Sequence, residues 1–534
     1  LIWGLFGIGF DILFGFTGLL SFGQSALYGT GGMVAAYLMT VVGFPHVVTA
    51  IFIGTIAAGV VGLLVGLIAL RRTGIYFAMI TVAIAEVFYF VEFNPLSQFT
   101  GGENGLPGVP TPVLSLGFTT IKFNTDATMY AFLAFWYFIG MVLALRIVRS
   151  PVGAVLSAIR DNPQRAAAVG HNIQAYKLTA FVIASIYAGF AGGLLGVMQG
   201  FMPPDAFTFD TSGQLVMQTA IGGAGTLFGP LVGAAVWLFL SDFFQTTLHL
   251  GATWKLVLGL VFVLLVVFLR HGIVGGLVDL YHHWRPAQSP VEAKHAVKPA
   301  VAAVESHRRH DRPMEGRGPV LEARGLTKRY GGITANKDIT FSVAEGELRG
   351  VIGPNGAGKS TFFKMLTGEV LPTAGQIFFR GQEITHKNVT EVCQTGLTKS
   401  YQINQLFPRL TVRQNLQIAA LAECRGAFRL DLFRNIEKVP GLAADIAGTL
   451  ALIDLTGRAD TKVVDLAYGE KRRLEIGLAL ATAPSVLLLD EPLAGMSPQE
   501  RVETVQLLKN IRQHRTLVVV EHDMDAVVEL AERI

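Results

Sequence analysis

The apolar and polar positions divide this chain into two halves with different patterns. In residues 1–285, apolar stretches long enough to cross a lipid bilayer recur between short polar loops. A shorter apolar piece at 213–222 runs into the glycine-rich segment 222–225, which is either a break beside a substrate path or a helix–helix turn. We expect eight longer membrane-spanning helices, near residues 1–20, 26–42, 47–70, 75–93, 128–145, 177–199, 229–247 and 253–270.

Basic residues in the short loops predict which side of the membrane each loop faces. The segment 146–177 holds five Lys and Arg residues against one acid, Arg71 and Arg72 form a second basic turn, and Arg270 ends the last span. Because cytoplasmic loops carry such an excess, we expect these three on the inside and the loop 94–127 on the outside.

Acids in or beside the apolar runs include Asp11, Glu86 and Asp242. Intramembrane acids usually face a bundle interior or a pathway, although acids near span ends also reach the interface. Glu86 is the most central of the three and is the candidate for lining a path.

After residue 319 the pattern changes to short β-rich runs that alternate with helical stretches. Alternation of this kind predicts an α/β domain with a largely parallel core. The preceding segment, 286–318, is rich in Pro, Ala and His and has no hydrophobic periodicity, which indicates a flexible linker. The β-rich runs lie at 341–343, 348–352, 377–379, 486–489 and 517–520.

The distribution of charged residues supports the same division into two halves. Only 21 of the first 285 residues are Asp, Glu, Lys or Arg, against 61 of the remaining 249. Because soluble domains are about 25% charged, the first half is typical of a membrane protein and the second of a soluble domain. The net charge of +4 is too small to indicate a nucleic-acid partner.

The strongest chemical signal is the run Gly-Pro-Asn-Gly-Ala-Gly-Lys-Ser-Thr at 353–361. It fits G-x-x-x-x-G-K-[ST] in full, follows an apolar strand and precedes a helical stretch, which is the setting of a phosphate-binding loop. Lys359 is expected to reach the β- and γ-phosphates of a nucleotide, and Ser360 to hold Mg²⁺. The expected phosphate contacts are Gly353, Asn355, Gly356, Gly358, Lys359, Ser360 and Thr361.

A second signal is the apolar strand 486–489 followed by Asp490 and Glu491. Ligands bind at the carboxyl ends of strands in such sheets. Asp490 is therefore expected to support Mg²⁺ and Glu491 to polarise an attacking water. A third signal is the run Leu-Ala-Tyr-Gly-Glu at 466–470, whose glycine stands beside a strongly helical sequence and offers a second phosphate site.

In this order, the three motifs resemble the ATP-binding subunit of ABC transporters over 320–534. The resemblance implies an ABC-type P-loop ATPase fold, with ATP and Mg²⁺ as cofactors. It assigns adenine stacking to Tyr330, a catalytic and Mg²⁺-linked role to Gln402, and a γ-phosphate contact to His522. It also identifies 466–470 as the signature sequence, with nucleotide contacts from Leu466, Tyr468, Gly469 and Glu470.

The signature departs from the usual pattern because Ala467 stands where Ser is normal, which removes a hydroxyl contact to the γ-phosphate. The form Leu-Ala-Tyr-Gly, continued by Arg-Arg-Leu-Glu-Ile at 472–476, is similar to the branched-chain amino acid uptake subfamily. The membrane half resembles the permeases of the same subfamily at 157–162, 166–170, 176–178, 21–24, 100–105 and 222–230. Its basic, amphipathic segment 150–172 is expected to dock into a groove on an ATPase.

We therefore expect an all-α polytopic permease domain at 1–285, the linker at 286–318, and an α/β ABC ATP-binding domain at 319–534 whose C-terminus is incomplete. The resemblance implies an ATP-driven importer of branched-chain or similar small amino acids in the cytoplasmic (inner) membrane, with the ATPase in the cytoplasm. Alternatives are an importer of urea or short amides, an ABC exporter half-transporter, and an ATP-gated regulator that does not transport.

The number of motifs also predicts partners. In the family a phosphate loop and a signature from different copies enclose ATP, and this chain has one of each. We therefore expect a second ATP-binding subunit, a second permease subunit and an extracytoplasmic substrate-binding protein, together with membrane lipid and a small-molecule substrate.

Overall fold

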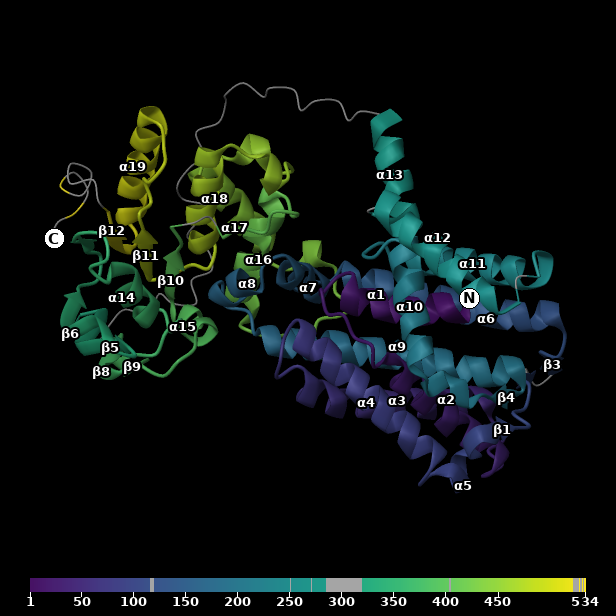
Figure 1. Ribbon diagram of the computed structural model, residues 1–534. Coiled ribbons are helices and arrows are strands. Elements are labelled where there is room, and N and C mark those ends of the chain that lie inside the picture. The colour runs from purple at the N-terminus through teal and green to yellow at the C-terminus, as the bar shows by residue number, and fades with distance from the viewer. Residues whose placement is uncertain are drawn as a thin grey trace. The chain divides into compact units, whose positions relative to one another are not determined.

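The computed structural model describes residues 1–115, 120–249, 251–269, 271–284, 319–402, 405–521, 528, 531 and 533–534. The chain forms two compact units (Figure 1). Unit 1 comprises Leu1–Arg160 and Gln174–Ser289, and unit 2 comprises Asp161–Ile173 and Pro290–Ile534. The segment 161–173, which comes from the middle of the apolar half, thus belongs by its contacts to unit 2. The predicted linker 286–318 lies outside the described residues.

Unit 1 is helical, as its hydrophobic pattern predicted. Two short antiparallel strand pairs, β1 (Leu106–Pro107) with β4 (Phe201–Met202) and β2 (Val113–Ser115) with β3 (Thr120–Lys122), accompany the helices. The helices are α1 (Ile2–Phe14), α2 (Gln24–Thr40), α3 (Val47–Ala69), α4 (Ile75–Phe93), α5 (Ser97–Thr100), α6 (Asp126–Val148), α7 (Pro151–Asp161), α9 (Ile173–Gln199), α10 (Phe209–Gly222), α11 (Gly229–Asp242), α12 (Trp254–Phe268) and α13 (Gly272–Trp284).

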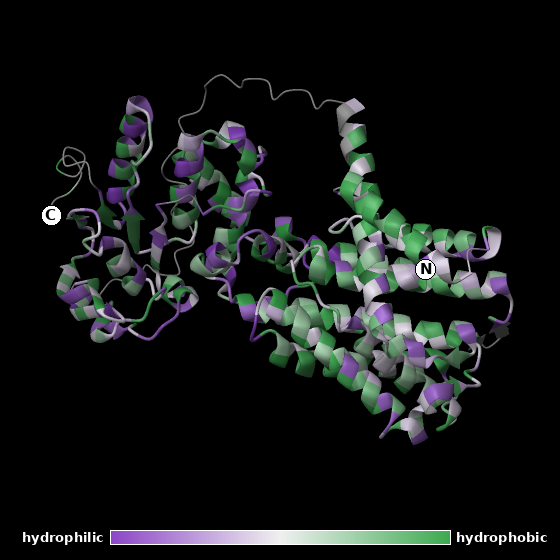
Figure 2. Cartoon of the chain, in the orientation of Figure 1, coloured by the Kyte–Doolittle hydropathy of each residue, from purple (hydrophilic) through white to green (hydrophobic). Residues whose placement is uncertain are grey.

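Several of these helices are long and apolar enough to span a membrane. Within the described part of the chain they are α3, α4, α6, α9 and the stretch Trp254–Val278. Figure 2 shows how strongly hydrophobic residues dominate the helices of unit 1. The span expected at 26–42 is a helix of the expected 17 residues. The spans expected at 1–20 and 229–247 are helices of 13 and 14 residues, shorter than the pattern suggested. They are shorter because α1 gives way to a turn before Gly18 and α11 to a π-helical turn at Phe243–Thr247.

The glycine-rich segment after α10 forms a tight helix–helix turn. A Cβ on Gly233 of α11 would lie 1.8 Å from the carbonyl oxygen of Gln218 on α10, so only glycine permits this close packing. The carboxylate of Asp11 accepts from the backbone N–H groups of Gly225 and Leu227 at 2.6 and 2.9 Å. Asp11 therefore holds this turn, and of the two interpretations of 222–225 the structure supports the turn.

The described residues of unit 2 form two four-stranded sheets. An antiparallel sheet has the order β6-β5-β8-β9, and a parallel sheet has the order β10-β11-β12-β7. The parallel sheet confirms the α/β pattern, and the β-rich runs of the sequence coincide with β6, β7, β8, β11 and β12. The strands are β5 (Leu321–Tyr330), β6 (Ile333–Val343), β7 (Leu348–Val351), β8 (Ala374–Phe379), β9 (Gln382–Glu383), β10 (Leu397–Ser400), β11 (Val486–Asp490) and β12 (Thr516–Val520).

Helices and an apolar core complete unit 2. Phe362, Phe363 and Leu366 of α14 pack with Leu488 of β11 and Val518 of β12 in one buried cluster. This cluster fixes the helix that follows β7 against the parallel sheet. The helices are α8 (Pro163–Ala168), α14 (Lys359–Leu366), α15 (Val389–Thr395), α16 (Val412–Arg425), α17 (Leu442–Leu452), α18 (Tyr468–Leu480) and α19 (Pro498–Arg512).

Candidate nucleotide-binding and hydrolysis site

The phosphate-loop motif lies in the turn between β7 and α14. Gly356 and Gly358 have φ angles of +81° and +87°, in the left-handed region that favours glycine. A Cβ on Gly358 would also lie 2.4 Å from the carbonyl oxygen of Ala335. The side chain of Asn336 donates to the carbonyl of Gly358 at 3.2 Å. Strand β6 therefore holds the end of the loop in a shape that requires glycine.

The loop leads directly into the N-terminus of α14, where backbone N–H groups have no acceptor within the helix. Lys359 is the first residue of this helix, and its ammonium donates to the carbonyls of Gly353 and Pro354 at 2.6 and 3.0 Å. Ser360 and Thr361 follow in the same turn. The structure thus brings together a cation, a hydroxyl and the positive end of a helix, which is a suitable arrangement for phosphate.

The end of β11 lies at the same edge of the parallel sheet. Asp490 pairs with Val520 of β12, which pairs in turn with Val351 at the end of β7. The buried carboxylate of Asp490 lies 3.3 Å from the Lys399 ammonium through Oδ2, while Oδ1 has no hydrogen-bond partner in the described part of the chain. A buried carboxylate oxygen with this remaining capacity fits a ligand of Mg²⁺, directly or through water.

Glu491 follows in an unusual backbone conformation. Its φ is +48°, which is uncommon for a residue with a side chain and is found at functional sites. Its backbone N–H donates to the carbonyl of Val520 at 2.8 Å. Its carboxylate accepts from the side-chain amide of Gln402 at 2.7 Å. The structure therefore brings Gln402 and Glu491 together, although they stand 89 positions apart.

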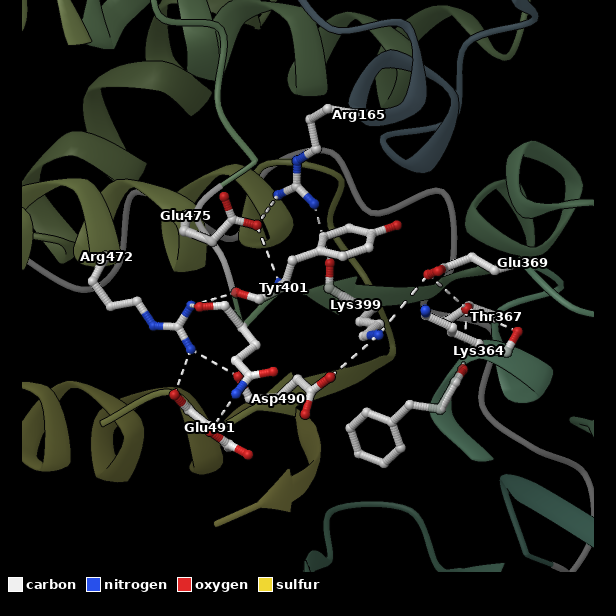
Figure 3. A network of polar contacts seen from close by, with 12 residues as sticks. Arg165, Lys364, Thr367, Glu369, Lys399, Tyr401, Arg472, Glu475, Asp490 and Glu491 are labelled. Atoms are coloured by element: carbon white, nitrogen blue, oxygen red, sulfur yellow. Dashed lines mark hydrogen bonds and ion pairs between the residues drawn. The ribbon is translucent and has the colours of Figure 1, made fainter. Parts of the chain in front are cut away.

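Arg472 on α18 holds this turn in place, as Figure 3 shows. Its fully buried guanidinium donates to the carbonyls of Asp490 and Glu491 at 2.8 and 2.6 Å. It also donates to the carbonyls of Tyr401 and Gln402. One side chain thus fixes both segments that carry the hydrolysis residues. The sequence contained this arginine in the subfamily run 472–476, but nothing in the pattern assigned it a role.

The signature residues lie at the start of α18, apart from the loop before α14. Glu470 accepts from the backbone N–H of Ala467 at 2.9 Å and pairs with Arg458 at 3.2 Å. The hydroxyl of Tyr468 donates to a carbonyl in the loop before α19. A Cβ on Gly469 would lie 1.9 Å from a carboxylate oxygen of Glu500, so α19 covers this glycine.

A buried ion pair joins α8 to the signature helix. Arg165 lies 3.1 Å from Glu475 of α18, and neither side chain is exposed. The guanidinium of Arg165 also donates to the carbonyl of Lys399 at 3.3 Å and stacks 5.3 Å from the ring centre of Tyr401 (Figure 3). Burial raises the pKa of Glu475, and the neighbouring Arg165 opposes that shift. Arg165 therefore contacts both the signature helix and the strand that leads to Gln402.

Further contacts attach the rest of the segment 161–173. The imidazole of His171 bonds the carbonyl of Ile418 on α16 at 2.8 Å. Burial, chiefly, lowers the pKa of His171 to about 4. Gln394 donates to the carbonyl of Gly170 at 3.0 Å, and the backbone N–H of Asn172 donates to Ala427 at 2.8 Å. The expectation that part of 150–172 docks against an ATPase therefore agrees with the contacts of the segment 161–173.

Two of the residues expected to contact the nucleotide lie at exposed positions. Tyr330 lies at the end of β5, where the hairpin to β6 begins, and its ring is half exposed. Asn355 is exposed in the phosphate loop. His522 lies outside the described residues.

Comparisons with known proteins match both parts of the chain. A family described as the permease component of a branched-chain amino acid transport system matches residues 1–266, and the ABC transporter family matches residues 336–494. The high-affinity branched-chain amino acid transport ATP-binding protein LivG of Escherichia coli is 36% identical over 225 residues, which cover 40% of this chain and 87% of LivG.

Two other similar proteins are an ATP-binding protein and a solved cassette. BraF of Pseudomonas aeruginosa, a protein with the same description as LivG, is 36% identical over 223 residues, with 40% of this chain and 87% of BraF covered. A crystal structure of the ADP conformation of an ABC transporter's ATP-binding cassette is 28% identical, has a TM-score of 0.36, and covers 40% of this chain and 85% of its own.

Proposed function

Because this chain belongs to the ABC transporter family, as a permease of the branched-chain amino acid type fused to an ATP-hydrolysing cassette, we propose that it imports branched-chain or similar small amino acids. Hydrolysis of ATP drives this import. The observation that carries the proposal is the contact of Gln402 with Glu491 at the edge of the sheet where the phosphate loop begins. The substrate class follows from the permease match over 1–266 and from the names of LivG and BraF.

Each residue at this edge has a distinct task. Backbone N–H groups of the phosphate loop and the Lys359 ammonium bind the β- and γ-phosphates. The Glu491 carboxylate orients and polarises the attacking water, and the Gln402 amide holds that carboxylate in position. Ser360 and Asp490 would hold Mg²⁺, which neutralises charge on the transferred phosphoryl group. Tyr330 stacks on the adenine ring.

The transporter needs more than this chain. The signature residues Leu466, Tyr468, Gly469 and Glu470 contact the nucleotide held by a second ATP-binding subunit. A second permease subunit completes the membrane part, and an extracytoplasmic binding protein delivers the substrate. The complex lies in the inner membrane with the cassettes in the cytoplasm, because the basic loops of the permease half face that side.

The substitution Glu491→Gln tests the hydrolytic role. It removes the charge that polarises water and keeps the shape and the contact with Gln402. We expect ATP hydrolysis by the purified full chain with its partner subunits to fall by at least about 100-fold, while ATP binding is retained. Glu437→Gln, an exposed acid in the same unit, is the matched control and should hydrolyse normally.

Uptake measurements in proteoliposomes test the substrate. Leucine supplied with the cognate binding protein should stimulate ATP hydrolysis and accumulate inside the vesicles. In the hydrolysis test, undiminished ATP hydrolysis by Glu491→Gln would refute the role assigned to Glu491. Stimulation by urea or short amides, and none by aliphatic amino acids, would refute the substrate class.

A further inference from the structure

Unit 1 contains a cavity of about 310 Å³ between α2, α4, α5 and the turn at Pro204–Phe207. Its wall is almost wholly apolar and includes the aromatic side chains of Tyr37, Phe88, Phe99 and Phe207. Ligand pockets in proteins measure about 300–1,000 Å³. This cavity is therefore at the small end of that range and suits a ligand with one short apolar group.

One acid lines the cavity among the residues that the structure describes. Glu92, in the last turn of α4, is 2% exposed, and neither carboxylate oxygen has a hydrogen-bond partner among the residues that the structure describes. Thr100 of α5 donates to the backbone carbonyl of Glu92 at 2.9 Å, which closes α5 over the end of the helix. Burying a carboxyl group without a partner is costly, so a fold that retains one is expected to gain something from it.

The position of the cavity agrees with substrate entry from outside. Because the basic loops predict that 94–127 is extracytoplasmic, the last turn of α4 lies near the outer surface. The glycine-rich run 100–105, which resembles the permease subfamily, begins at Thr100 on the cavity wall. A binding protein would release its ligand on this side.

We propose that this cavity binds the transported amino acid, with Glu92 pairing with its ammonium group, the aromatic wall surrounding its aliphatic side chain, and its carboxylate at the open side of the cavity. The proposal rests on the import function and adds a substrate contact within the membrane unit. The ammonium supplies the partner that the carboxylate lacks, and the apolar wall favours branched side chains over polar ones. The sequence drew attention to Glu86 instead, which is exposed on the same helix.

Ligand binding without ATP tests the site directly. The full chain in lipid nanodiscs is titrated with radiolabelled L-leucine, in competition with 3-methylbutylamine or 4-methylpentanoate. The amine keeps the ammonium and the acid lacks it, so the amine should compete at least about tenfold better. Glu92→Gln should weaken leucine binding at least about tenfold, because the amide cannot pair with a cation.

Two further variants keep the test independent of folding. Glu86→Gln is the matched control and should bind leucine as the unmodified chain does. Val34→Phe, which fills the cavity from α2, should block leucine binding while ATP hydrolysis is retained. Equal leucine binding by Glu92→Gln and the unmodified chain, or equal competition by the acid and the amine, would overturn the proposal.

The outcomes separate this site from the import function. If the unmodified chain binds no leucine but its hydrolysis responds to the loaded binding protein, the cavity site is wrong and the import function stands. If leucine binds through Glu92 but no binding protein stimulates hydrolysis, the import function is wrong and the site stands.

Discussion

At the scale of single residues, Arg472 has the largest set of bonds around the hydrolysis turn. Its guanidinium donates to carbonyls of Asp490, Glu491, Tyr401 and Gln402, and all of these bonds come from one buried side chain. A positive φ at Glu491 costs energy that such surroundings must offset. Arg472 is therefore a positioning residue for hydrolysis, which acts through the backbone of the segments that carry Gln402 and Glu491.

We expect Arg472→Met to lower kcat for ATP hydrolysis by at least about tenfold and the free energy of unfolding by about 3 kcal/mol, because several buried carbonyls lose their donor. The Km for ATP should change little, since the phosphate loop is untouched. Arg473→Met is the control, because the ion pairs of the neighbouring Arg473 in the described part of the chain are with the exposed acids Asp454 and Glu503. Steady-state kinetics with chemical denaturation measures both effects. A changed Km with normal kcat would contradict the positioning role.

At the scale of elements, the segment 161–173 is held by a group whose charge depends on pH. The buried imidazole of His171 has a pKa of about 4, whereas a free histidine titrates near 6.5. Between these values the released segment binds more protons than the docked one. Docking is therefore at full strength above pH 6.5 and weakens as the pH falls towards 4.

We expect hydrogen-exchange protection of the segment to fall by up to about tenfold per pH unit in this window, after correction for intrinsic exchange. His171→Gln keeps a donor for Ile418 and removes the titration, so its protection should vary less with pH. His514→Gln, an exposed histidine of the same unit, should behave as the unmodified chain. An unchanged pH dependence in His171→Gln would refute the assignment.

How much the sequence predicted also depends on the scale of the interaction. The phosphate loop, β7 and β11 were predicted because each depends on residues close together in the chain. The ion pair of Arg165 with Glu475 was not, because it joins residues 310 positions apart that only the packed fold brings together. Glu92 was missed for a related reason. At the end of an apolar helix an acid usually reaches water, whereas here Glu92 is buried and lines a cavity together with Phe207 and residues of α5.

At the scale of the whole molecule, the chain carries one phosphate loop and one signature, and these lie on different elements of unit 2. An ATP site formed between subunits therefore needs a second chain. The second chain is either another copy of this one or a different cassette. Two complementary variants distinguish these cases, because each removes one half of the site.

Lys359→Ala removes the ammonium of the phosphate loop, and Gly469→Asp places a negative charge at the signature. A Cβ at Gly469 would lie 1.9 Å from a carboxylate oxygen of Glu500, so the Glu500 side chain has to turn away to admit the aspartate. Each variant alone should be inactive in ATP hydrolysis. If two copies of this chain enclose ATP, a mixture restores about a quarter of the normal rate, since half of the dimers are mixed and each has one intact site. Continued inactivity of the mixture, with both variants folded and able to associate, would show that the second cassette is a different chain.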